Sequence, residues 1–87
     1  MYYLYILHLQ KTNQLYTGST GNLKLRLKDH KYGKVNSTKS KSPKLIYYEV
    51  YKLKSDAQRR ERFLKTTEGK RLLRQQLRDI LKEIGYI

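Results

Sequence analysis

The stretch LYTGSTGNLKLRLKDH, residues 15–30, decides the fold, because its second half is compatible with two structures. From Leu23 to Leu27 every second residue is a leucine, and this alternation is typical of a half-buried strand. On a helix, however, Arg26 and His30 would lie four residues apart on one face. The pattern alone supports a strand and a helix about equally.

A helix over this segment would bring Leu23, Leu27 and His30 onto one face, and only Leu25 would point elsewhere. The residues just before it include several that favour helix N-caps, namely Ser19, Thr20 and Asn22. A strand would be regular, but it would leave these N-cap candidates unexplained. The alternation of leucines therefore predicts a strand, whereas the N-cap candidates predict a helix.

The strand signals elsewhere are clearer. Residues 2–9 are rich in β-forming residues, and residues 15–18 resume an extended pattern after a polar turn at 11–14, which predicts an antiparallel hairpin. Residues 45–53 predict a third strand, apolar enough to be central in its sheet. The segment 33–44 is rich in Ser and Lys and holds the only Pro, so it predicts a solvated basic loop that also touches phosphates.

Helical patterns dominate the last third of the chain. Ser55 is expected to be the N-cap of one helix, and Gly69 to break it. From Lys70 onward, apolar residues recur at helical spacing and predict a closing amphipathic helix. Its apolar stripe, from Leu73 to Ile84, either belongs to the core or is partly offered to a second copy of the chain. If the opening segment is also a helix, the order of elements is β-β-α-β-α-α.

Charge is the strongest feature of the composition. Twenty Lys and Arg residues against seven Asp and Glu give the 87-residue chain a net charge of +13. We expect one small domain, residues 1–87, and such an imbalance in a small domain is usually compensated by a polyanion. A membrane-surface helix needs a wide apolar face with Trp or Phe, and the chain has no Trp and one Phe. Nucleic acid is therefore the expected partner; a merely soluble basic protein or a ribosome-associated passenger is the remaining alternative.

The chain has no cysteine, which excludes disulfides and thiolate metal sites and favours the cytoplasm. It shows no charged-then-apolar leader and no apolar run of about 18 residues, so neither a signal peptide nor a membrane span is predicted. Because Met1 lies directly before a strand-like run, the chain is expected to be complete.

Few side chains are suited to chemistry. No cluster of His, Asp and Glu has metal-ligand spacing, and there is no Walker loop and no Gly-x-Gly-x-x-Gly. What remains is a set of phenols, basic groups and one carboxylate: Tyr5, Tyr16, Arg26, His30, Glu61 and Lys65. Such a set suits phosphodiester chemistry, because Arg binds phosphate oxygens, a carboxylate can hold Mg²⁺, and Tyr or His can orient or deprotonate water.

Two short motifs about ten residues apart resemble the signature of the GIY-YIG nuclease superfamily. Residues 3–5 (Tyr-Leu-Tyr) stand where Gly-Ile-Tyr would, and residues 16–18 (Tyr-Thr-Gly) where Tyr-Ile-Gly would. The similarity continues through residues 22–30, KLIYYEVY at 44–51 and DAQRRERFLK at 56–65. The length resembles the small stand-alone, single-domain bacterial branch (UPF0213-like) rather than the homing endonucleases or the excision-repair nucleases, which carry further DNA-binding domains.

The resemblance implies an α+β fold, with a three-stranded antiparallel sheet flanked by helices, in which residues 23–30 form a helix. It also implies a metal-dependent endonuclease that hydrolyses phosphodiester bonds in DNA, either structure-specific or acting in repair or recombination. Mg²⁺ or Mn²⁺ would be the cofactor. A homodimer, or a protein partner that supplies specificity, is compatible with so small a domain.

Carried over by residue, the resemblance implies that Tyr5 and Tyr16 line the cleft and that one of them assists the nucleophilic water. Arg26 would bind the scissile phosphate, and His30 would hydrogen-bond in the same network or transfer a proton. Glu61 would be the single metal-binding carboxylate. Contacts with the nucleic acid are expected from Gly18, which would allow close backbone approach, and from Lys28, Lys34 and Lys65.

The sequence departs from the family pattern in two places. Tyr3 replaces the Gly of the first motif, a change that small members tolerate, and the late polar residue of many active members is not identifiable, with Thr66 and Thr67 as candidate substitutes. These departures leave a second function open, a nucleic-acid-binding module with a degenerate nuclease site. His8 shows no partner and is expected to be an ordinary strand residue.

Overall fold

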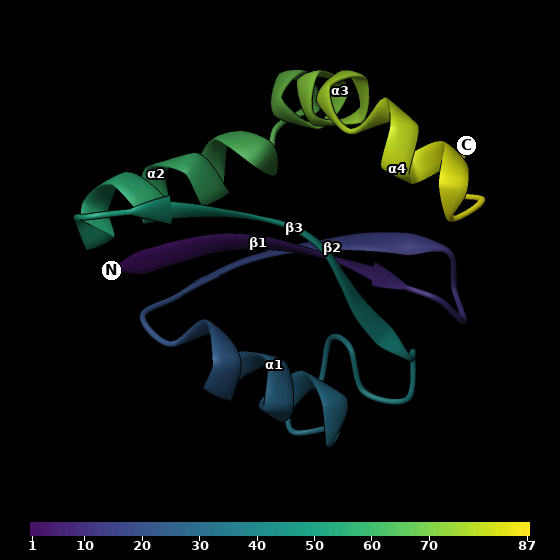
Figure 1. Ribbon diagram of the computed structural model, residues 1–87, viewed down its shortest axis with the longest axis horizontal. Helices are drawn as coiled ribbons and strands as arrows, with labels where there is room; N and C mark the ends of the chain where they lie inside the picture. The colour runs from purple at the N-terminus through teal and green to yellow at the C-terminus, as the bar shows by residue number, and fades with distance from the viewer.

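A computed structural model describes all 87 residues. Its strands form a three-stranded antiparallel sheet in the order β2-β1-β3 (Figure 1). The strands are β1 (Tyr2–Leu9), β2 (Gln14–Thr20) and β3 (Pro43–Tyr51). The fold expected from the resemblance is confirmed, but the prediction that the third strand is central was wrong. The central strand is β1, which is buried on both faces from Leu4 to Leu9, whereas Tyr48 and Val50 of β3 are about half exposed.

Helices cover both faces of this sheet, as Figure 1 shows. Helix α1 lies on one face, and α2, α3 and α4 lie on the other. None of the four is long and apolar enough to cross a membrane. Their bounds are α1 (Leu23–Lys31), α2 (Lys54–Leu64), α3 (Thr67–Gln76) and α4 (Arg78–Glu83).

The ambiguous segment forms helix α1. The side chain of Asn22 caps it by accepting a hydrogen bond of 3.1 Å from the backbone N–H of Leu25. Leu23 and Leu27 pack against the buried cluster on the same face of β1, while the side chain of Leu25 is 56% exposed. The single leucine that breaks the helical pattern is thus the one left in solvent.

Two predicted helix boundaries were wrong. Ser55 lies inside α2, which begins after Leu53 without any side-chain cap. Gly69 does not end a helix but lies in the first turn of α3. The boundary is set instead by Thr66, whose hydroxyl accepts a 3.0 Å hydrogen bond from the Gly69 N–H and donates one of 2.6 Å to the Phe63 carbonyl.

The closing apolar stripe is used in the core. Leu73, Leu77 and Leu81 are buried with Leu4 and Ile6 in one cluster between the sheet and the helices. The stripe is divided between α3 and α4, which meet at Leu77, so the chain has one helix more than the sequence pattern predicts. The expectation that the stripe belongs to the core is met by these three leucines, while the alternative that it is partly offered to a second copy stays a prediction.

A polar cluster fastens the β3 edge to α2. The carboxylate of Glu49 accepts hydrogen bonds of 2.6 Å from the hydroxyls of Tyr47 and Tyr51 and bonds of 3.0 and 3.1 Å from the guanidinium of Arg60. This bidentate Arg–carboxylate pair is only partly exposed. It therefore holds the two side chains more firmly than a single-contact ion pair on the surface does. It fixes the position of α2, and hence of Glu61, the next residue.

The β1–β2 turn corrects the expectation for His8. Its Nε2 lies 2.8 Å from Oδ1 of Asn13, so this histidine has a partner. Asn13 has a positive φ of 52°, a conformation that Asn tolerates better than most residues. The turn is thereby closed by a side-chain hydrogen bond as well as by the strands.

A test of the α2–α3 junction is Gly69→Ala. Helix propensity alone predicts stabilisation of about 1 kcal/mol. However, a Cβ at this position would overlap the carbonyl oxygen of Phe63, so the backbone must move. We expect a loss of about 2 kcal/mol of unfolding free energy in urea denaturation, typical of an overpacked site. The exposed Gln75→Ala in the same helix is the control, expected within about 0.5 kcal/mol of wild type; a stabilised Gly69→Ala variant would contradict the junction geometry.

Candidate active site

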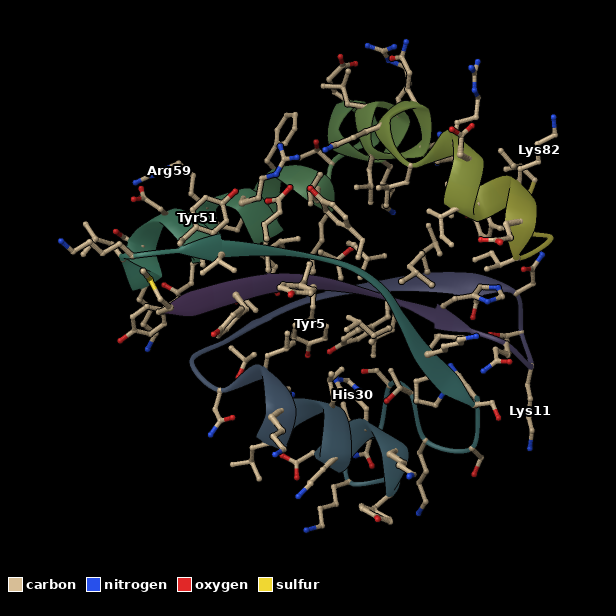
Figure 2. The ribbon with its side chains drawn as sticks, in the orientation of Figure 1. Tyr5, Lys11, His30, Tyr51, Arg59 and Lys82 are labelled. Atoms are coloured by element: carbon tan, nitrogen blue, oxygen red, sulfur yellow. The ribbon has the colours of Figure 1, made fainter.

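Three buried polar side chains form a continuous chain between the sheet and α1. The hydroxyl of Tyr5, from the central strand, lies 2.8 Å from Nε2 of His30 on α1. The other ring nitrogen of His30, Nδ1, lies 2.8 Å from Oγ1 of Thr38 in the loop after α1. All three residues are at most 2% exposed, and Figure 2 shows Tyr5 and His30 pointing toward each other. Hydrogen bonds this deeply buried are shielded from competing water.

Tyr16 completes an aromatic group around this chain. Its ring centroid lies 5.2 Å from that of His30 and 6.4 Å from that of Tyr5. Its side chain is only half buried, whereas Tyr5 is 1% exposed. Of the two tyrosines expected to line a cleft, it is therefore Tyr16 that reaches the surface.

Gly18 leaves the space that the ring of Tyr5 occupies. The two residues are paired across the β1–β2 ladder, and the tyrosine ring lies over the glycine. A Cβ on Gly18 would lie 2.5 Å from the Tyr5 hydroxyl oxygen and 2.6 Å from Cζ. The close approach that this glycine allows is thus that of Tyr5, while contact with a nucleic acid stays a prediction.

Arg26 lies beside the hydroxyl of Tyr5. Burial raises the pKa of Tyr5, and hydrogen bonding with Arg26 lowers it; the net effect is a raised pKa. Tyr5 is therefore a protonated phenol at neutral pH. The one carboxylate near Arg26 is that of Asp29, at 4.0 Å, so most of the hydrogen-bonding capacity of the guanidinium is not taken up by an acid.

His30 is held in its neutral form. Burial lowers the pKa of its imidazole from the ordinary 6.5, the positive charge of Arg26 lowers it further, and the charge of Asp29 opposes these two effects. A neutral imidazole has one nitrogen that donates and one that accepts. His30 can therefore accept a proton from Tyr5 on one side while it is hydrogen-bonded to Thr38 on the other.

Glu61 approaches the site from the opposite face of the sheet. Its Oε1 accepts a short hydrogen bond from the hydroxyl of Ser19, and its Oε2 one of 2.8 Å from Lys65. Burial raises the pKa of the Glu61 carboxyl, but the hydrogen bonds from Lys65 and Ser19 outweigh this effect and lower it. Glu61 is thus an ionised carboxylate, only partly exposed, on a strongly basic protein.

Strand β2 connects the two halves of the site. Alternate residues of a strand point to opposite faces, so Gly18 lies under Tyr5 while its neighbour Ser19 reaches Glu61. Three effects raise the pKa of Tyr5: burial is the largest, the nearby Tyr16 is second, and the negative charge of Glu61 is third. The carboxylate and the tyrosine–histidine chain are therefore both positioned by strand β2, on opposite faces of the sheet.

Comparison with known proteins shows which family the chain belongs to. Residues 1–75 match the family model of the GIY-YIG catalytic domain. This chain belongs to the GIY-YIG family. It is 38% identical over 88 residues to a UPF0213 protein of Clostridium perfringens, a match that covers 99% of this chain and 94% of the relative. It is 43% identical over 67 residues to a UPF0213 protein of Staphylococcus haemolyticus, covering 75% of this chain and 80% of the relative. No solved structure matches significantly.

The resemblance inferred from the two short motifs is thereby confirmed. GIY-YIG domains form a nuclease superfamily, so the substrate class is a nucleic acid, and nucleases of this superfamily generally depend on a divalent metal. No group of three or more His, Asp or Glu side chains in this GIY-YIG domain could hold a metal ion by itself. A lone ionised carboxylate suits Mg²⁺ well, because this ion keeps several waters and is bound through one or two carboxylates plus substrate phosphates.

The remaining predicted residues lie around this centre rather than in it. Lys28 and Lys34 are exposed, on α1 and in the following loop, and no side-chain hydrogen bond or ion pair joins them to the tyrosines or to Glu61. Thr66 uses its hydroxyl as the cap of α3, and Thr67 is exposed, so neither is hydrogen-bonded to the tyrosine–histidine chain or to Glu61.

Two members of the site were not predicted, Ser19 and Thr38. Ser19 was considered only as a helix N-cap, although its position next to Gly18 on a strand indicates that it points to the opposite face. Thr38 lies in a segment predicted as a solvated loop, yet it is fully buried. No sequence signal for Thr38 stands out, because its burial depends on how the loop folds back onto His30.

Gly18→Ala tests the packing under Tyr5. The added Cβ would force the phenol away from its place, and we expect the hydrogen bond to His30 to be lost together with about 2 kcal/mol of unfolding free energy. Urea denaturation and the imidazole ¹⁵N resonances of His30 would be measured. The control is Gly21→Ala, whose Cβ would lie 3.4 Å from the Tyr2 ring, an ordinary contact. Unchanged His30 resonances in Gly18→Ala would contradict this arrangement.

A second test uses the pH dependence of stability. Because the pKa of His30 is lower in the folded than in the unfolded chain, the unfolded state binds its proton first as the pH falls. Neutral His30 therefore makes its full contribution to the free energy of unfolding above about pH 6.5. This contribution is lost as the pH drops from there toward the folded-state pKa. Urea denaturation of wild type and His30→Gln across this window should show a steeper loss in wild type. Equal slopes would show that His30 is not buried in neutral form.

Proposed function

We propose that this GIY-YIG domain is an endonuclease that hydrolyses phosphodiester bonds in DNA and requires Mg²⁺ or Mn²⁺. The observation that carries this proposal is the arrangement of a buried phenol, a neutral imidazole and an arginine on one side of β2, with a single ionised carboxylate on the other side. A protein that only binds nucleic acid has no use for a partly buried, ionised carboxylate on a strongly basic surface.

The proton of the attacking water is taken up by Tyr5 and His30 together. Tyr5 carries its own proton at neutral pH, so it cannot act as a preformed phenolate. As the water attacks phosphorus, its proton passes to the Tyr5 oxygen while the Tyr5 proton passes to Nε2 of His30, 2.8 Å away. The P–O bond to the leaving sugar oxygen breaks, and this oxygen takes up a proton from solvent. The half-buried Tyr16, whose hydroxyl forms no hydrogen bond with the protein, orients the water from the exposed side.

Arg26 binds the scissile phosphate and stabilises the charge that develops on it. Its planar fork of donors matches phosphate oxygens, and its loose pair with Asp29 does not compete strongly. Arg26 lies beside the Tyr5 hydroxyl, and we propose that its movement onto the phosphate gives the attacking water access to Tyr5. The negative phosphate then offsets the effect of Arg26 on His30 and makes the imidazole a better base.

Glu61 would hold the metal ion, which would supply Lewis-acid polarisation of the phosphate. Ser19 keeps one carboxylate oxygen in a fixed orientation, because its own strand is part of the sheet. Lys65 donates to the other carboxylate oxygen, and we propose that its ammonium also contacts a substrate phosphate.

The rest of the surface supports binding of a polyanion. Five of the twenty Lys and Arg residues form ion pairs, which leaves fifteen without an acidic partner. Lys28 and Lys34 are among these and are proposed to contact the phosphate backbone. We also propose that residues 1–87 act as one domain, since Leu77 and Leu81, beyond the matched residues, share a core with β1. A role in repair or on branched DNA, a homodimer or a specificity partner, and a cytoplasmic location remain predictions.

The test is cleavage of labelled single-stranded, duplex and branched DNA with Mg²⁺ or Mn²⁺, comparing wild type, Glu61→Gln and Asp56→Asn. Asp56 is the matched control, an acid on the same helix that pairs only with Arg59. We expect EDTA to abolish cleavage, Glu61→Gln to reduce it about 1,000-fold and Asp56→Asn to leave it unchanged. Salt-sensitive binding without cleavage of any substrate would overturn the enzyme proposal and leave a nucleic-acid-binding module with a degenerate site.

A further inference from the structure

The loop between α1 and β3 contains one residue that is buried like a core residue. Thr38 has no exposed surface, although its neighbours Ser37 and Lys39 are exposed. Its Oγ1 lies 2.8 Å from Nδ1 of His30 and 3.4 Å from the carbonyl oxygen of Val35. Burying a hydroxyl is unfavourable unless it is hydrogen-bonded, so the donor and acceptor roles of Thr38 must be compatible with both hydrogen bonds at once.

Counting donors and acceptors assigns the protons along this chain. The hydroxyl of Thr38 donates its proton to the Val35 carbonyl, so toward Nδ1 of His30 its oxygen can only accept. The phenol proton then needs an acceptor, and the one beside it is Nε2 of His30. In a neutral imidazole the proton must consequently be on Nδ1, which donates it to Thr38.

Thr38 completes this assignment. Its oxygen accepts from Nδ1–H, and its own proton is directed to the Val35 carbonyl. The opposite assignment, with Thr38 donating to Nδ1, would give up the hydrogen bond to the Val35 carbonyl and place an N–H of His30 against the phenol oxygen. The phenol proton would then have no acceptor within the protein.

We propose that Thr38 is a positioning residue that fixes His30 as its Nδ1–H tautomer, so that Nε2 faces Tyr5 as a proton acceptor. The hydrogen bond made by one imidazole nitrogen generally decides where the proton sits on the other. The tautomer follows from hydrogen bonding alone, whereas its importance for catalysis rests on the proposed nuclease function.

The loop is built to keep Thr38 in place. The Thr38 N–H donates to the Val35 carbonyl at 3.1 Å, and its own carbonyl accepts from Lys41 at 3.1 Å. The far end of the loop is tied to the turn after β1 by a backbone hydrogen bond of 3.1 Å from Lys11 to Lys41. A loop held at both ends can transmit a fixed geometry to His30.

The test compares Thr38→Val, which keeps the shape but removes the hydroxyl, with Thr38→Ser, which keeps the hydroxyl. Ser37→Ala is the control for a change in the same loop at an exposed position. In ¹⁵N-labelled protein, the chemical shifts of the two ring nitrogens of His30 report the tautomer directly. We expect Nδ1–H in wild type, Thr38→Ser and Ser37→Ala, and a shift toward Nε2–H in Thr38→Val.

In the cleavage assay, Thr38→Val is expected to lower kcat about 100-fold with little change in KM, because the buried Thr38 does not touch substrate. Thr38→Ser should restore most of the rate. Three results would overturn the proposal: Nε2–H in wild type, an unchanged tautomer in Thr38→Val, or a rate loss that Thr38→Ser shares. A tautomer switch in a protein that cleaves nothing would support the positioning role while refuting the nuclease proposal.

Discussion

The hydrogen bond between Tyr5 and His30 is the contact on which the rest of the structure depends. It joins the central strand to α1 through two side chains that are almost completely buried. A buried polar pair is tolerated only when every donor and acceptor is satisfied, and this requirement explains its surroundings. Gly18 leaves room for the phenol, Thr38 occupies the second nitrogen of the imidazole, and Arg26 faces the phenol oxygen.

Strand β2 turns this local arrangement into a site with two sides. Because consecutive residues of a strand face opposite ways, Gly18 and Ser19 serve the tyrosine on one face and Glu61 on the other. The edge position of β2 leaves no further strand to separate these two sides. The polar cluster around Glu49, on the other edge strand β3, holds α2 in position. The location of the Glu61 carboxylate therefore depends on contacts at the opposite edge of the sheet from β2.

Much of this architecture could be predicted from the sequence, for identifiable reasons. Strands with many β-forming residues, and the residues of the two family motifs, were located because their signals are local. The helix at residues 23–31 could not be derived from periodicity, since Leu25 gave the segment an alternating pattern although its side chain lies in solvent. Gly69 was misinterpreted because its small size serves a contact with Phe63, which no local pattern reveals. The place of β3 at the edge, and the burial of Thr38, likewise depend on residues distant in the chain.

One strand, β1, contributes alternately to the site and to the core. Tyr5 and Leu7 face α1, whereas Leu4 and Ile6 face the cluster of α2, α3 and α4. A shift of pairing by one residue would exchange these two sets, moving the phenol away from His30 and Leu4 and Ile6 out of their core at the same time. A chain with incorrect pairing would thus lose its core together with the Tyr5–His30 hydrogen bond. No stably folded form with this bond out of alignment is therefore available, so the stability of the fold and the geometry of the polar chain are selected together.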